Sequence, residues 1–180
     1  MKKNWIALAL LGMSMQIQAM DIVSADMQDG KALQQAQVFN SFGCNGDNLS
    51  PQIAWSKAPQ GTKSFAITMY DPDAPTGSGW WHWTVVNIPA RVNMLPAGAG
   101  QAGGANLPPG AVMGRTDFGA AAFGGACPPV GDQPHRYQLT VWALDTEQLP
   151  LNQDSSGALV GYMIRAHALG QASLTARYGR

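Results

Sequence analysis

The chain has 180 residues, of which 46% are hydrophobic and only 12% are charged, and its basic and acidic side chains are equal in number. This length fits one domain with a substantial core, and the near-neutral charge without basic clusters excludes nucleic-acid binding and electrostatic docking on anionic membranes. The 21 glycines and 12 prolines indicate many turns, so we predict a β-rich fold with extended connections rather than long helices.

Residues 1–19 have the pattern of a secretory signal peptide. Two lysines near the start precede an apolar run over 5–13, and Ala19 offers a small residue for cleavage. A transmembrane anchor is the alternative, but this apolar run is too short to cross a bilayer. We therefore expect a periplasmic or secreted protein without a transmembrane anchor. Its mature domain, 20–180, would carry a formal charge of −2, from nine Lys and Arg against eleven Asp and Glu.

Six segments alternate apolar and polar residues as strands do, and proline or glycine bounds most of them. In chain order they are Asp21–Met27, Gln52–Trp55, Ser64–Tyr70, Trp81–Ile88, Tyr137–Leu144 and Ser173–Tyr178. Because the segments lie too close together for helical crossovers, we predict a largely antiparallel sheet.

One helix is predicted near the C-terminus, because apolar residues recur at helical spacing from Leu159 to His167. Asp154 or Ser155 is expected to cap its start, and Gly170 to end it. Such a helix would cover one edge or face of the sheet, and His167 is interpreted as one of its structural residues.

Residues 96–134 are dominated by Gly, Ala and Pro and have no strong period. A loop of this length inside a compact domain is usually functional or disordered. Cys127 and the Pro-Pro pair after it favour an ordered binding loop. The GxGxxG match over 98–103 neither follows a clear strand nor opens a helix, so we do not expect a dinucleotide site.

The two cysteines, Cys44 and Cys127, predict one disulfide if the protein is exported to an oxidising compartment. Both lie in Gly/Pro-rich loops whose backbone can adapt to a cross-link. The alternative is two unpaired cysteines that only lie close together.

The segment Asp71-Pro-Asp-Ala-Pro75 directly follows a predicted strand. Two prolines fix φ and stiffen this loop, so Asp71 and Asp73 are held at the end of the strand. A binding site can use two such carboxylates. The plainer interpretation is a solvated turn, since Asp and Pro are common turn residues.

Two histidines are candidate ligand contacts. His82 stands among Trp80, Trp81 and Trp83, which would give it a partly dry wall, and a core histidine beside aromatic rings is the alternative. The loop that begins at Cys127 delivers His135 and Tyr137 to the start of a strand. The strand period of two places those two side chains on one face, with Arg136 on the other, where it can pair with a loop carboxylate.

Together these segments resemble the phosphatidylethanolamine-binding proteins, also called Raf kinase inhibitor proteins. The resemblance rests on the ordered set Asp71-Pro-Asp-Ala-Pro75, Trp80-x-His82, Val85-Val-Asn-Ile-Pro89, Cys127-Pro-Pro-x-Gly131 and His135-Arg-Tyr137. Flanking segments, including Asp117-Phe-Gly119, are similar to the bacterial branch, and with a signal peptide the chain looks like its periplasmic members. The resemblance covers nearly all of the mature chain.

The resemblance implies a mostly β fold, in which a large central antiparallel sheet packs on a smaller sheet with a C-terminal helix nearby. It also implies a pocket for phosphate-like groups at one end of the large sheet. The residues expected to line this pocket are Asp71, Trp80, His82, Pro128, His135 and Tyr137. Asp73 is counted with them as the support of the first loop.

Two residues depart from the family pattern. Phe123 stands where many relatives have tyrosine, which implies one hydroxyl fewer near the pocket. Ala126 replaces the proline that usually precedes the cysteine, and we expect a looser loop there.

The sequence thus favours an exported binding protein for a small phosphate- or carboxylate-bearing ligand, such as a phosphoethanolamine head group. The alternative is an inhibitor of a protein partner, a protease or a kinase, that acts through the pocket rim. An enzyme is not expected, because no activated nucleophile is visible. No cofactor and no metal site are expected, since the histidines and carboxylates lack a diagnostic ligand spacing. The oligomeric state is open, with a homodimer as one alternative.

Overall fold

The computed structural model describes residues 19–180, and the predicted signal peptide lies almost wholly outside this range. Its elements are β1 (Asp21–Val23), a 3-10 helix (Gln35–Gln37), β2 (Ile53–Ser56), β3 (Ser64–Asp71), β4 (Trp80–Pro89), β5 (Met94–Leu95), β6 (Val112–Met113), β7 (His135–Leu144), α1 (Gly157–His167) and β8 (Ala168–Tyr178). No helix among the described residues is both long and apolar enough to cross a bilayer.

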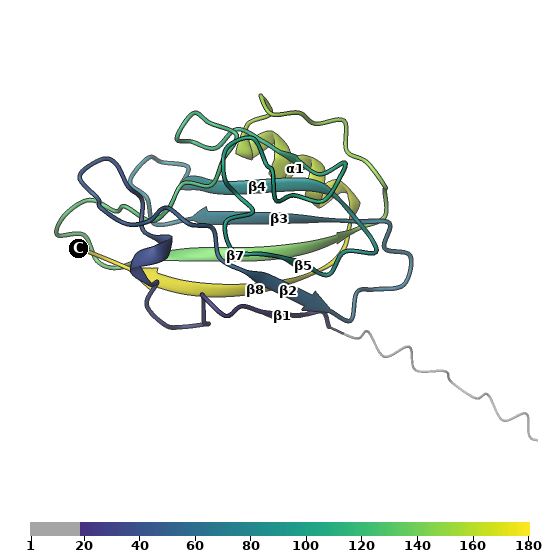
Figure 1. The fold of residues 1–180 in the computed structure, drawn as a ribbon, viewed down its shortest axis with the longest axis horizontal. Coiled ribbons are helices and arrows are strands. Elements are labelled where there is room, and N and C mark those ends of the chain that lie inside the picture. Colours follow the sequence, from purple (N-terminus) through teal and green to yellow (C-terminus); the bar gives the residue numbers. More distant parts are fainter. Residues whose placement is uncertain (1–18) are drawn as a thin grey trace, which may run out of the picture.

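The strands form two antiparallel sheets, as predicted. The large sheet has the order β6-β4-β3-β7-β8, and the small one has the order β1-β2-β5 (Figure 1). Alternating apolar side chains of the two sheets face each other and form the main core, which includes Trp55, Ile67, Trp83 and Leu139. The prediction of a large sheet packed on a smaller one is therefore confirmed.

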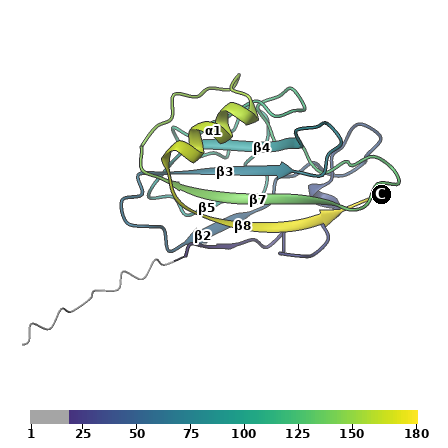
Figure 2. The ribbon, with the colours of Figure 1, turned by 180° about the vertical axis from the view of Figure 1, so that it is seen from behind.

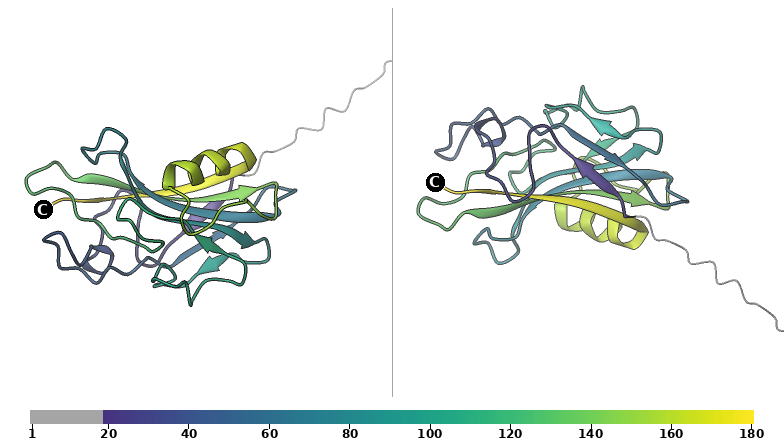
Figure 3. Two further views of the ribbon diagram at one scale, coloured as in Figure 1. Left: turned by 90° about the horizontal axis from the view of Figure 1, so that it is seen from above. Right: turned by 90° about the horizontal axis from the view of Figure 1, so that it is seen from below.

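The helix α1 covers the other face of the large sheet (Figures 2 and 3). Val160 and Ile164 of α1 pack there on Ala66, Val86 and Trp142, which belong to β3, β4 and β7. The large sheet is thus the middle layer, with the small sheet on one side and α1 on the other.

Two predicted helix boundaries are wrong. The hydroxyl of Ser156, rather than Asp154 or Ser155, accepts the backbone N–H of Leu159 and caps the helix. The Ser155 hydroxyl donates instead to the side chain of Asn152. The helix ends at His167 rather than at Gly170, because β8 starts at the next residue, Ala168.

The strand predictions differ in length from the structure at both ends of the chain. The first strand keeps only its first three residues, because the Ser24 hydroxyl bonds to the backbone of 26–27 and turns the chain. The last strand starts at Ala168, five residues earlier than predicted, and pairs with β7 over its whole length. Pairing along a long neighbour overrides the weak local pattern of 168–172.

Candidate functional site

The predicted site residues gather at one end of the large sheet, where the C-terminus also lies (Figure 1). Because β4, β3 and β7 are neighbouring antiparallel strands, the end of β3 lies beside the starts of the other two. A cavity of about 220 Å³ opens there. Its walls include six predicted residues: Asp71, Trp80, His82, Pro128, His135 and Tyr137.

A β-bulge delivers His82 to this cavity. Tyr70 pairs with Trp81 and Met69 pairs with Trp83, so His82 is the extra residue on β4. The bulge allows the consecutive residues His82 and Trp83 to lie on the same face of the sheet, His82 at the cavity and Trp83 in the main core. Trp81 packs closely against Gly157 at the start of α1, on the other face. Bulges commonly re-aim side chains in this way beside functional sites.

The His82 ring is almost fully buried and is held by one hydrogen bond. Its Nδ1 lies 2.7 Å from the carbonyl oxygen of Gly124, and a carbonyl only accepts, so Nδ1 carries the proton. Burial lowers the pKa of His82, and it outweighs the opposing effects of the Gly124 carbonyl and the Asp71 carboxylate. His82 is therefore a neutral imidazole near neutral pH, and no hydrogen bond within residues 19–180 engages its Nε2.

The lowered pKa of His82 predicts an acid-sensitive fold. The unfolded chain takes up the His82 proton near its ordinary pKa of 6.5, whereas the folded chain takes it up only at lower pH. The free energy of unfolding should therefore fall as pH drops below about 6.5, by at most about 1.4 kcal/mol per pH unit. We expect His82→Asn to remove this part of the slope in urea titrations between pH 7.5 and 5, and His167→Asn to retain it. Parallel slopes in the wild type and His82→Asn would contradict the assignment.

His135 is fixed between two carboxylates. Its Nδ1 lies 2.7 Å from Asp71 Oδ2, and its Nε2 lies 3.3 Å from Asp132 Oδ2. The other Asp71 oxygen accepts the backbone N–H of Asp73 at 2.8 Å. Both oxygens of Asp71 are thus engaged, and this residue orients the His135 ring while holding the shape of its own loop.

Asp73 does not line the cavity. Its carboxylate accepts hydrogen bonds from Arg136 Nε and one terminal nitrogen, the closest at 2.6 Å, and from the Arg136 backbone N–H at 2.8 Å. The Arg136 guanidinium lowers the pKa of Asp73 to about 2. Asp73 therefore ties the loop after β3 to the start of β7, and the predicted pairing of Arg136 with a loop carboxylate is present.

Two buried polar groups on the cavity wall have no hydrogen-bond partner within the described protein. They are the indole N–H of Trp80 and the hydroxyl of Tyr137. Burial raises the pKa of Tyr137, so its hydroxyl keeps its proton. A buried donor without a partner costs about 1–3 kcal/mol, and such groups in folded proteins call for an explanation.

Of the tryptophans expected around His82, only Trp80 lines the cavity, and the sequence did not single out two phenylalanines at its rim. Phe42 and Phe118 both line it, and the Phe118 ring lies 5.4 Å from the ring centres of both Trp80 and His82. Phe118 belongs to the Asp117-Phe-Gly119 triplet, whose Asp117 carboxylate accepts the backbone N–H of Trp81 at 2.7 Å. Asp117, held against β4 by this hydrogen bond, thus positions Phe118. A contact between segments this far apart in the chain leaves no pattern in the local sequence.

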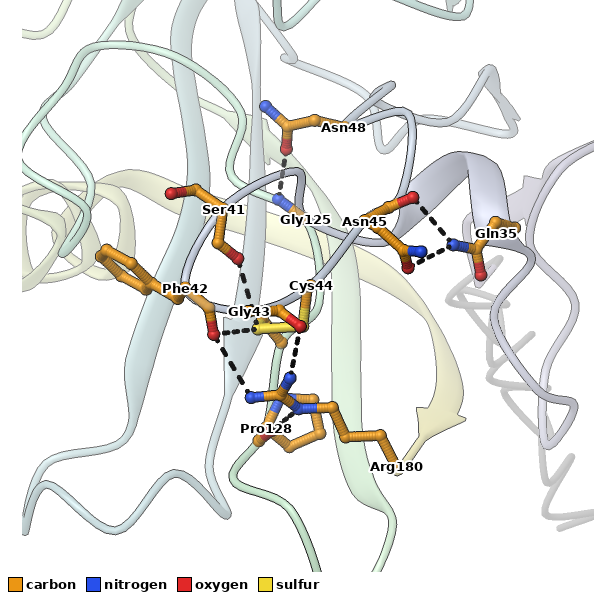
Figure 4. Close-up of a disulfide and its surroundings, with 11 residues drawn as sticks. Gln35, Ser41, Phe42, Gly43, Cys44, Asn45, Asn48, Gly125, Pro128 and Arg180 are labelled. Carbon is orange, nitrogen blue, oxygen red and sulfur yellow. Dashed lines mark hydrogen bonds between the residues drawn. A yellow bond between two sulfur atoms is a disulfide. The ribbon is translucent and has the colours of Figure 1, made fainter.

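A disulfide between Cys44 and Cys127 joins the two loops that carry Phe42 and Pro128 (Figure 4), as predicted. The Cα atoms of the two cysteines are 6.0 Å apart. Arg180 strengthens the connection, because its guanidinium donates at 2.7 Å to the Pro128 carbonyl and at 2.8 Å to the carbonyl of Gly43.

The two departures from the family pattern have little effect on the cavity. Phe123 is buried against Trp83 in the core and does not line the cavity. Ala126 donates its backbone N–H to the Gln37 carbonyl at 3.0 Å, a bond that proline cannot make. The backbone at Ala126 is therefore tied to the 3-10 helix at Gln37.

The chain is similar to several known proteins. Residues 23–179 match the family model for the phosphatidylethanolamine-binding protein. The chain is 57% identical over 171 residues to the UPF0098 protein YbcL of Escherichia coli K12, covering 95% of this chain and 93% of that one, and 50% identical over 159 residues to its UPF0098 protein YbhB, covering 88% and 99%.

More distant and structural comparisons agree with these matches. The putative lipoprotein LppC of Mycobacterium tuberculosis H37Rv is 31% identical over 137 residues, which cover 76% of this chain and 63% of that protein. The crystal structure of E. coli YbcL, described as a new member of the mammalian PEBP family, superposes with a TM-score of 0.89 over 91% of this chain and 99% of that one. The chain therefore belongs to the phosphatidylethanolamine-binding protein family.

Proposed function

We propose that this chain binds a small phosphate-like ligand, including the phosphoethanolamine head group, in the cavity between Asp71 and His82. The observation that carries the proposal is the pair of buried donors, Trp80 Nε1 and Tyr137 Oη, that have no partner within the described protein. Both line the same cavity, and oxyanion oxygens would satisfy them with charge-assisted hydrogen bonds.

The proposed role is binding rather than catalysis. Of the lining residues that carry a thiol or an aliphatic hydroxyl, Cys127 is held in the disulfide and Thr76 donates its hydroxyl to the Gly79 carbonyl. Neither is activated by an adjacent base, which a nucleophilic mechanism requires.

Trp80→Phe tests the proposal. The change keeps an aromatic ring but removes the indole N–H, and the loss of one hydrogen bond to a charged ligand costs about 1.5–3 kcal/mol. Calorimetry with inorganic phosphate and phosphoethanolamine at pH 6 should show affinity at least tenfold weaker than in the wild type. Trp81→Phe, on the other face of β4, is the matched control and should bind like the wild type. Absence of phosphate binding to the wild type would exclude the proposed function.

An inhibitor of a protein partner is the second candidate. Two apolar side chains beside the cavity support it, because Phe42 is 66% exposed and Val130 is 76% exposed. Exposed apolar groups around a pocket are typical of protein contacts. Stoichiometric protection of a purified envelope protease, lost in a Phe42→Ser, Val130→Ser variant that still binds phosphate, would favour this role.

We also propose that the protein is exported. The signal-peptide pattern of residues 1–19 and the Cys44–Cys127 disulfide support an oxidising compartment such as the periplasm. The name of the mycobacterial relative, a putative lipoprotein, is consistent with the cell envelope.

A further inference from the structure

The helix α1 covers only part of the face of the large sheet on which it lies. Figure 2 shows β7 and β8 uncovered along much of their length beside the helix. A groove of about 280 Å³ lies on this face, and it shares no lining residue with the cavity that contains His82. Its volume is close to the lower limit of small-molecule sites, about 300 Å³. The groove is therefore a second candidate site on the opposite face of the sheet.

Uncharged polar side chains form the floor of this groove. Two successive rows contribute one residue from each of β3, β7 and β8. The rows are Tyr70, Gln138, Thr175 and Thr68, Thr140, Ser173. Gln171 extends the surface along β8, and the side-chain amides of Gln138 and Gln171 make no hydrogen bond within residues 19–180. Each amide therefore offers a donor and an acceptor to a ligand.

Three aromatic rings also line the groove. The rings of Tyr70 and Trp81 have centroids 4.7 Å apart, are tilted by 45°, and are only half-buried. Trp142 lies deeper, and its indole N–H donates to the Thr68 hydroxyl at 3.0 Å. Aromatic faces beside amides and hydroxyls suit a ligand that has an apolar C–H face and many hydroxyl groups. A pyranose sugar has both features.

Arg165 supplies the charge of the groove. It is the one charged residue among the lining residues of the described chain, and its guanidinium carbon lies 5.4 Å from the centre of the Trp142 ring. No ion pair or hydrogen bond within residues 19–180 engages this guanidinium, so it is free to bind a carboxylate with two parallel hydrogen bonds. Gly161, one turn earlier on α1, lies against the ring of Trp81. The guanidinium and that ring therefore border the same stretch of the groove.

We infer that the groove binds an acidic saccharide, with the carboxylate of a hexuronic acid on Arg165 and the sugar ring against Trp81. The amides of Gln138 and Gln171 would bind the hydroxyl groups. This site goes beyond the proposed phosphate site and does not depend on it. A lipid chain is disfavoured because the floor consists of hydrogen-bonding groups. A peptide cannot extend the sheet here, because the groove lies on a face whose strands already pair with one another.

Two probes that differ only in the carboxylate, methyl glucuronide and methyl glucoside, test the inference. NMR spectra of the backbone and indole N–H groups locate even weak binding during a titration of the wild-type protein at low salt. We expect saturable shifts of the Trp81 indole and of β7 and β8 amides. The glucuronide should bind about threefold more tightly, a gain within the range of exposed ion pairs. Equal affinities, no saturable shift, or shifts confined to residues around His82 would overturn the inference. Phosphate binding in the other cavity would be unaffected by any of these results.

Arg165→Gln should lower the affinity for the glucuronide to that for the glucoside. Arg91→Gln is the matched control, because it removes an exposed positive charge from the loop after β4 and should keep the preference. Thermal melts check that both variants fold. A preference that survives in folded Arg165→Gln would overturn the role given to Arg165. Triglutamate has carboxylates but no sugar ring, so binding of this peptide as tightly as the glucuronide would also overturn the assignment of a saccharide.

Discussion

Replacing both Cys44 and Cys127 by serine is expected to lower the free energy of unfolding by about 4 kcal/mol. The cross-link joins residues 83 apart in sequence, so it removes a large loop-closure entropy from the unfolded chain. A loss of this size is a large share of the 5–15 kcal/mol that typically stabilises a domain. Urea titrations of the oxidised wild type, the reduced wild type and the double variant measure it.

The reduced wild type is the control for the serine side chains. It should match the double variant in stability, because both lack the same cross-link. Equal stability of the oxidised and reduced wild type would show that the disulfide contributes nothing, and the entropic explanation would then be wrong.

Loss of the disulfide should also weaken ligand binding, but less than loss of one of the two buried hydrogen-bond donors of the cavity, Trp80 or Tyr137. Arg180 still connects the loops through the carbonyls of Gly43 and Pro128, so the rim keeps part of its position. We expect the double variant to bind phosphate several-fold more weakly than the oxidised wild type, and Arg180→Ala in the double variant to weaken it further.

Local periodicity predicted the candidate site best on β7. His135 and Tyr137 face the cavity and Arg136 faces away, because successive side chains of a strand point to opposite faces of the sheet. On β4 the same rule fails, because it would place Trp81 and Trp83 on one face of the sheet. A bulge is set by pairing with β3 rather than by the residues of β4 alone, so the sequence could name His82 but not its direction.

Residues from the loops were harder to predict than residues from the strands. Phe42 and Phe118 reach the cavity through a disulfide and through the Asp117 contact with Trp81, and both contacts span long stretches of sequence. The partner of His82 is a backbone carbonyl, Gly124, which no side-chain motif can reveal. The family resemblance supplied the order of the segments, whereas the tautomer of His82 follows only from the structure.

Tyr137→Phe is expected to have opposite effects on stability and on binding. The Tyr137 hydroxyl is buried without a partner within the described protein, so removing it should raise the free energy of unfolding of the ligand-free protein by about 1 kcal/mol. The same change removes a donor from the cavity and should weaken phosphate binding at least tenfold, since a hydrogen bond to a charged group contributes about 1.5–3 kcal/mol. A residue that lowers stability while supporting binding is expected at a functional site.

Tyr70→Phe is the matched control on the neighbouring strand. Its hydroxyl donates to the Ser78 carbonyl at 2.7 Å and does not line the cavity. Removing that satisfied hydrogen bond should lower the stability by about 1 kcal/mol and leave phosphate affinity unchanged. Thermal unfolding and calorimetry of the two variants therefore give four results, three changes of stated direction and one affinity that stays unchanged. A Tyr137→Phe protein that is less stable than the wild type and binds phosphate equally well would show that this hydroxyl serves the fold. The free-energy cost of burying the hydroxyl would then be offset by packing rather than by a ligand.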